Sequence, residues 1–244
     1  MDKIRDGYVC PPALEHHDEF SWFAREYPRC YRHHLSHASF RLQSMYSLYE
    51  ATHIYASAAL SANRGGGSLI SFNIGQAPVE HVYWDFEAFL GAIGSALDVL
   101  ARIVGLAFDR QTPSSFNKLC AQRDLDGPVS ILRLAKREWV ETLKDYRDCF
   151  VHYTPVDTLL YFEIKYGRKT CYLHARLPSN PNARDITEFR FRPAVDVLHY
   201  TVGVYRQMIC LDQVIAKELL ALYDCGAYPK RFRFLFGVGR RERV

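Results

Sequence analysis

The chain has 244 residues, of which 48% are hydrophobic and 24% charged. This balance is typical of a globular protein and excludes a disordered or fibrous chain. The net charge is +4, and the positive charge is concentrated at the C-terminal end. Residues 229–244 carry six basic side chains and one acidic one, Glu242, for a charge of +5, so residues 1–228 sum to −1. We predict one domain over 1–228 and a basic C-terminal tail over 229–244.

Helical spacing of apolar residues dominates the first part of the chain. Residues 13–27 have this spacing, and Pro28 is expected to end the helix that they form. A longer helix is predicted over 29–63, where apolar residues recur at steps of three and four before the glycine-rich loop 64–78. The next helix is predicted over 79–108. Its apolar stripe is Phe86, Phe89, Leu90, Ile93, Leu97, Leu100, Val104 and Phe108.

The second half mixes helical and β patterns. Gly127-Pro128 begins a helix that runs to about Tyr153, and residues 158–177 hold two β-rich runs that indicate a hairpin. A third short strand is an option at 188–191. A last helix is predicted over 193–223, with Pro193 in its first turn. The predicted fold is mainly α: a bundle of four to five long helices with a small β-hairpin insertion at about 158–177.

Two residues at the end of helix 128–153 suggest chemistry. The predicted core stripe of this helix is Leu132, Ala135, Trp139, Leu143, Tyr146 and Phe150. At about 100° per residue, Arg147 and His152 both lie off that stripe. Arginine can bind phosphate with two donors, and histidine can transfer a proton near neutral pH. RNA cleavage by the 2′-hydroxyl needs a base, an acid and a cation, and a symmetric dimer would supply two copies of each residue.

The string YRDCFVHY, residues 146–153, resembles the R-x4-6-H motif of the HEPN superfamily, in which a polar residue such as Asp148 often follows the arginine. Residues 84–103 look like the earlier core helix of that family, with its acidic residue matched by Asp98. The resemblance covers roughly residues 30–225. It implies a helical bundle, a homodimer with the motif at its interface, and metal-independent endoribonuclease activity. Such proteins often act in toxin–antitoxin or antiviral defence systems, with an antitoxin or another defence protein as partner.

An alternative function remains open, because many HEPN proteins have lost catalysis and the hairpin and tail lie outside the minimal bundle. The chain would then be a catalytically silent HEPN-like module that binds RNA, a nucleotide or a partner protein. Arg147 would form an ion pair with Asp148 or another carboxylate, and His152 would only stabilise the C-terminus of its helix.

Other candidate residues also have two interpretations. Asp98 either orients Arg147 or His152 or pairs with Arg102 one turn away. Tyr153 either donates a hydrogen bond to phosphate or is a partly buried aromatic residue. In the tail, Lys230, Arg231 and Arg233 either attract RNA or stay solvated.

No metal and no cofactor are expected. His33 and His37 are four residues apart, but no glutamate completes an HExxH pattern, so we interpret them as solvated. The seven cysteines are scattered without a CxxC pair, which fits a reducing cytoplasm, and Cys149 is interpreted as a small buried side chain. No stretch approaches the roughly 18 consecutive apolar residues of a membrane span, and the polar start Met1–Arg5 does not resemble a secretion signal. A cytoplasmic protein without a membrane anchor is therefore expected.

Overall fold

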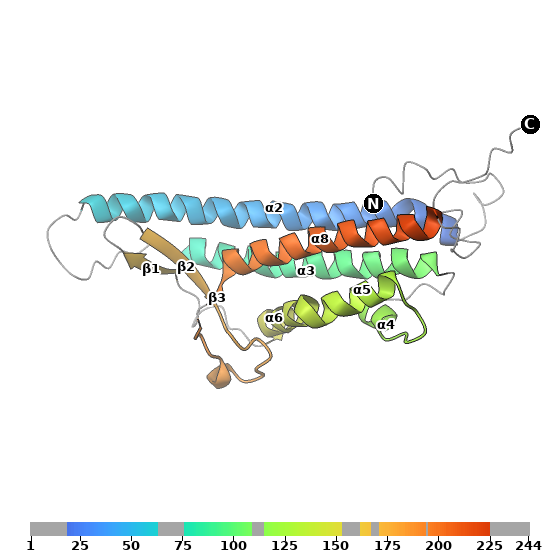
Figure 1. Ribbon diagram of the computed structural model, residues 1–244. Helices are drawn as coiled ribbons and strands as arrows, with labels where there is room; N and C mark the ends of the chain where they lie inside the picture. The colour runs from blue at the N-terminus through green and yellow to red at the C-terminus, as the bar shows by residue number, and fades with distance from the viewer. Residues whose placement is uncertain are drawn as a thin grey trace, which may run out of the picture. The chain divides into compact units, whose positions relative to one another are not determined.

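The computed structural model describes residues 19–62, 76–108, 115–152, 162–166, 171–193 and 195–224 (Figure 1). These residues form a mainly α structure with several long helices and a small antiparallel sheet, which confirms the predicted fold class. The helices are α2 (Glu19–Ala62), α3 (Gln76–Ala107), α4 (Phe116–Cys120), α5 (Pro128–Ala135), the π-helical turn η2 (Lys136–Val140), α6 (Glu141–His152), the 3-10 turn η3 (Ile186–Glu188) and α8 (Val197–Asp224).

The sheet has the strand order β1-β2-β3. Strand β1 (Phe162–Tyr166) pairs antiparallel with β2 (Cys171–Leu177), with Phe162 opposite Ala175. The hairpin predicted at about 158–177 is therefore confirmed for these strands, whereas its turn lies outside the described residues. The third strand is β3 (Val195–Asp196), paired with the end of β2, and the strand proposed at 188–191 is absent from this described stretch.

The chain divides into two compact units. Unit 1 comprises residues 1–36, 92–141 and 206–244, and unit 2 comprises residues 37–91 and 142–205. Both units use parts of α2, α3 and α8, because the boundaries fall inside these helices. The single domain expected over 1–228 stays a prediction.

Unit 1 buries the second half of α3, and polar side chains bind the backbone at both ends of α4. Asp98 on α3 accepts a hydrogen bond from the backbone N–H of Phe116 at 2.8 Å, at the start of α4. Arg133 on α5 donates to the carbonyl oxygens of Cys120, at 3.1 Å, and Gln122. Burial raises the pKa of the Cys120 thiol to about 11, so this thiol stays protonated at neutral pH.

Unit 2 buries the first half of α3 against α2, α6 and α8. The apolar stripe predicted for α3 is confirmed across both units, because all its members except Phe108 are buried. On α8 the apolar residues at helical spacing are also in the interior: Tyr200 and Leu222 are half-buried, and the buried ones are Val197, Val204, Met208, Leu211, Ile215 and Leu219. Buried side chains of unit 2 on α2 are Ala38, Met45, Tyr49, Thr52 and Ala56.

The helix end predicted at Pro28 is wrong, because Pro28 lies inside α2. A proline inside a helix removes one backbone hydrogen bond and costs about 3 kcal/mol. Here the neighbouring Tyr27 and Tyr31 are both buried, and the guanidinium of Arg102 lies 5.8 Å from the Tyr27 ring centroid. Burial of large aromatic side chains on both sides of the proline offsets its local cost.

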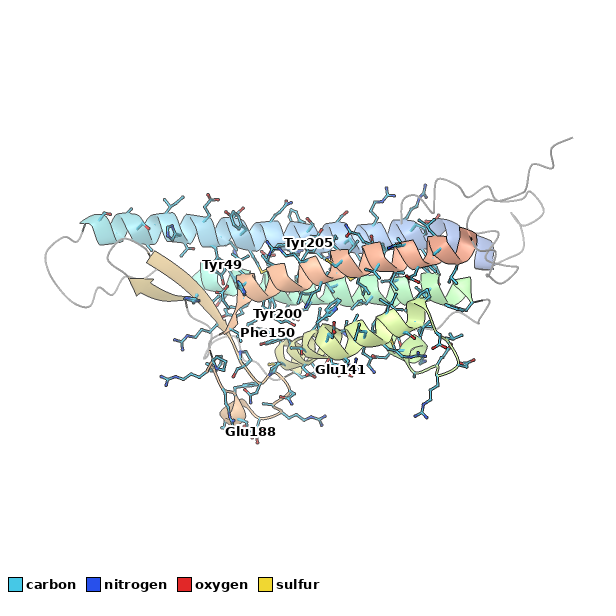
Figure 2. The ribbon with its side chains drawn as sticks, in the orientation of Figure 1. Tyr49, Glu141, Phe150, Glu188, Tyr200 and Tyr205 are labelled. Atoms are coloured by element: carbon cyan, nitrogen blue, oxygen red, sulfur yellow. The ribbon has the colours of Figure 1, made fainter. Side chains whose placement is uncertain are left out.

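The start predicted for the last helix at Pro193 is also wrong, because α8 begins at Val197 and Asp196 precedes it. Oδ1 of Asp196 accepts a hydrogen bond from the backbone N–H of His199 at 2.9 Å, as a helix N-cap does. Its Oδ2 accepts one hydrogen bond from the Tyr49 hydroxyl at 2.9 Å and another from the Ala175 backbone N–H at 3.1 Å. Tyr49 is labelled in Figure 2. One carboxylate thus joins α2, β2 and α8, and burial raises the pKa of Tyr49 well above its ordinary value.

Replacing Asp196 by alanine is expected to lower the free energy of unfolding by about 2 to 4 kcal/mol, because it removes a helix cap and leaves the Tyr49 hydroxyl and Ala175 N–H without this acceptor. Urea denaturation would measure the loss. Asp185→Ala is the control, since Asp185 caps η3 through Thr187 at an exposed site and should matter less. Equal losses in both variants would contradict the role given to Asp196.

Helix α3 also contains a stretch, Glu80–Gly105, that is long and apolar enough to cross a membrane. This is weak evidence for a span, because 67% of the apolar window is buried inside the protein, as in a core helix. The expectation of no membrane anchor stays a prediction.

Candidate active site on helix α6

The helix that carries the candidate residues is interrupted by one π-helical turn. The long helix predicted over 128–153 consists of α5, the turn η2 and α6. A π turn contains one additional residue, and here both Trp139 and Val140 are buried. After this turn Leu143, Tyr146 and Cys149 are buried while Phe150 is half-buried, so the expectation of a buried Cys149 is confirmed.

An aromatic cluster of Tyr83, Phe86, Tyr146, Phe150 and Tyr200 holds the inner face of α6 in unit 2. The Phe86 ring centroid lies 5.2 Å from that of Phe150, 6.1 Å from Tyr146 and 6.0 Å from Tyr200. The Tyr146 and Tyr200 ring centroids are 4.6 Å apart, and Figure 2 labels Phe150 and Tyr200 in this cluster. Such edge-to-face pairs favour one arrangement of α3, α6 and α8.

A hydrogen bond adds to this packing. The Tyr146 hydroxyl donates to the carbonyl oxygen of Pro178 at 2.8 Å. Burial raises the pKa of both Tyr146 and Tyr200 above the ordinary value for tyrosine, so neither hydroxyl ionises near neutral pH. The inner face of α6 is therefore a neutral, fixed support.

Arg147 and His152 both lie on the outer part of α6 and are exposed. Five residues of helix separate them by about 7.5 Å along the axis and about 140° around it. Arg147 forms no ion pair or hydrogen bond with any residue in the described ranges, so no ion pair joins it to the half-buried Asp148. Its guanidinium can therefore bind an anion without first giving up a carboxylate partner among these residues.

An exposed aliphatic side chain lies between the two candidate residues. Val151 is 51% exposed and directly precedes His152. Lys144 adds a second exposed cation one turn before Arg147. The outer face of α6 thus combines two cations, one imidazole and an apolar contact point.

The other predicted residues are placed differently. Asp98 belongs to unit 1 and its Oδ1 caps the start of α4, while Arg147 and His152 belong to unit 2. Tyr153 lies outside the described residues, as do the tail residues Lys230, Arg231 and Arg233. Within the described ranges, no group of three or more His, Cys, Asp or Glu side chains could hold a metal ion.

Sequence reasoning missed a polar connection between α2 and α3 in unit 2. Arg41 donates to Oδ1 of the buried Asp85 at 2.9 Å, and its Nε donates to Nε2 of His37 at 3.1 Å. Of the two histidines expected to be solvated, His33 is exposed, whereas His37 is half-buried and accepts this hydrogen bond. A usable signal was Asp85 itself, a carboxylate inside the otherwise apolar run 82–86.

Comparison with known proteins gives no relative: no family model, no curated protein and no solved structure matches the chain.

Proposed function

We propose that the chain is a metal-independent endoribonuclease that acts as a homodimer, with Arg147 and His152 as its catalytic residues. The observation that supports the proposal most is their position on α6. Both side chains are exposed at the end of a helix whose other face is held by the aromatic cluster. Groups on such a fixed support can be held in place for a substrate without a large ordering cost.

The proposed reaction uses the RNA's own 2′-hydroxyl as nucleophile. One His152 takes the proton of this hydroxyl while the 2′-oxygen bonds to the adjacent phosphorus. The bond from phosphorus to the 5′-oxygen breaks, and the partner's His152, in its protonated form, gives a proton to that oxygen. Arg147 stabilises the negative charge that develops on the phosphorane. The products are a 2′,3′-cyclic phosphate and a free 5′-hydroxyl.

A dimer would solve a geometric difficulty of the single chain. Because Arg147 and His152 point in directions about 140° apart, one copy presents them poorly to one phosphate. A two-fold axis near α6 would bring Arg147 of one copy toward His152 of the other. We expect the interface to use the helical regions 84–103 and 128–153. An antitoxin or another defence protein would then regulate the dimer.

The proposal predicts cleavage without metal. Purified protein is incubated with end-labelled single-stranded RNA in the presence of a chelator, and the product ends are analysed. We expect cutting to continue in chelator and the 5′ fragments to carry 2′,3′-cyclic phosphate. Cutting that stops in chelator, or fragments that end in a 3′-hydroxyl, would contradict the mechanism. No cutting of any RNA would instead favour the silent HEPN-like binding module.

The dimer is tested separately by placing a charge on α6. Val151→Glu is expected to convert the dimer to a monomer and to lower cleavage, because a carboxylate beside Asp148 would lose its water in the proposed interface. Val214→Glu on α8 is the matched control, since Val214 is 43% exposed and lies outside the proposed interface. Light scattering measures the mass of each variant. A wild-type monomer at micromolar concentration would contradict the proposed assembly.

A further inference from the structure

Two exposed aromatic side chains lie beside the connection between α2 and α3 in unit 2. Phe40 on α2 is 61% exposed and Trp84 on α3 is 52% exposed. Phe40 precedes Arg41 and Trp84 precedes Asp85, and the 2.9 Å ion pair joins Arg41 to Asp85. The two rings therefore lie at the same level of two adjacent helices. A contiguous exposed apolar patch can mark a binding site, so two large exposed rings on neighbouring helices make this surface a candidate.

An arginine or histidine side chain lies beside each ring. The Arg41 guanidinium carbon lies 5.5 Å from the Phe40 ring centroid, and the His81 ring centroid lies 5.1 Å from that of Trp84. Arg41 is held in place by Asp85 and His37, yet its side chain is still 35% exposed. The surface thus presents two aromatic faces, each beside a group that can donate hydrogen bonds. We call these four residues the aromatic surface: Phe40, Arg41, His81 and Trp84.

We propose that the aromatic surface binds single-stranded RNA, with bases stacked on Phe40 and Trp84 and phosphates bound by Arg41 and His81. Stacking uses the flat face that every base has, and a neighbouring donor can reach the phosphate of the stacked nucleotide. Bases inside a duplex are already stacked and cannot use these rings. A protein partner fits less well, because an apolar contact over both rings would remove from water the His81 ring and those Arg41 donors that Asp85 and His37 do not use.

The choice of RNA rests on the proposed function, in which RNA is the substrate. The aromatic surface contains neither Arg147 nor His152. Binding can therefore be measured on a His152→Ala chain, whose expected slow cleavage keeps the RNA intact during the measurement. Because Trp84 is the first residue of the region 84–103 expected at the dimer interface, light scattering must show that Trp84→Ala keeps the mass of its parent protein. A failure of the binding proposal and a failure of the nuclease proposal then appear in different assays.

The test measures fluorescence anisotropy of a labelled single-stranded oligonucleotide with the full-length His152→Ala protein. Phe40→Ala and Trp84→Ala are each expected to weaken binding about 5-fold to 150-fold, because loss of one stacked base costs about 1–3 kcal/mol. Trp84→Phe should keep most of the affinity, because phenylalanine still offers a ring. Ile54→Ala is the matched control, because Ile54 lies on α2 like Phe40, is 63% exposed and has no aromatic ring.

A second measurement reports stacking directly. Unlabelled oligonucleotide should quench the tryptophan fluorescence of the His152→Ala protein, and this quenching should disappear in the Trp84→Phe background. A duplex of the same sequence should quench much less. Unchanged affinity in both Phe40→Ala and Trp84→Ala would overturn the proposal, and so would equal losses in Ile54→Ala or no binding by the parent protein. Circular dichroism confirms that each variant is folded.

Discussion

Replacing His152 by alanine is expected to lower the rate of RNA cleavage by about 10² to 10⁴, because in the proposed symmetric dimer a single substitution removes both the proposed general base and the proposed general acid. The measurement is a single-turnover rate with saturating protein and chelator present. His152 is exposed, so its replacement should leave the thermal unfolding midpoint nearly unchanged. A loss of rate at constant stability would separate a catalytic role from a structural one.

Arg147→Ala should reduce the same rate by about 10² to 10³, the usual effect of removing one group that stabilises charge in a transition state. Arg147→Lys should restore only part of it, because lysine cannot offer two parallel donors to phosphate. Lys144→Ala is the control, since it removes an exposed cation from the same helix. If Lys144→Ala and Arg147→Ala lowered the rate equally, Arg147 would contribute only general positive charge. Cleavage at the wild-type rate by His152→Ala would show that the catalytic site lies elsewhere.

Replacing Phe86 by alanine is expected to lower the free energy of unfolding by about 3 to 5 kcal/mol. Phe86 is fully buried, and its ring contacts Tyr146, Phe150 and Tyr200, so the substitution would leave a cavity at the centre of the aromatic cluster. Because this cluster supports α6, cleavage should fall together with stability. Urea denaturation followed by circular dichroism measures the change.

Phe40→Ala is the matched control for Phe86→Ala, because both substitutions delete the same ring. Phe40 is largely exposed, so its loss should change the free energy of unfolding by no more than about 0.5 kcal/mol. Similar losses in the two variants would show that the aromatic cluster does not hold α6 as described. A smaller loss for Phe86→Leu would further indicate that filled volume, more than ring pairing, stabilises the cluster.

The amino-acid sequence alone was sufficient to predict the long helices and the hairpin. In α3 the apolar residues keep a three- and four-residue spacing from Phe86 to Val104, and such a stripe can be buried only in a helix. The β-rich runs of 158–177 likewise predict two strands. The exposure of Arg147 and His152 followed from their angles to the same kind of stripe, because the direction of a side chain on a helix depends only on its position.

Other features were decided by tertiary structure, because they depend on contacts between residues far apart in the chain. Pro28 favours a helix end by its local chemistry, yet burial of Tyr27 and Tyr31 keeps α2 continuous. The start of α8 depends on Asp196, which binds Tyr49, 147 residues away. The ion pair of Arg41 and Asp85 spans 44 residues and aligns Phe40 with Trp84. Periodicity describes one helix at a time, so it cannot show which polar groups of two helices will meet.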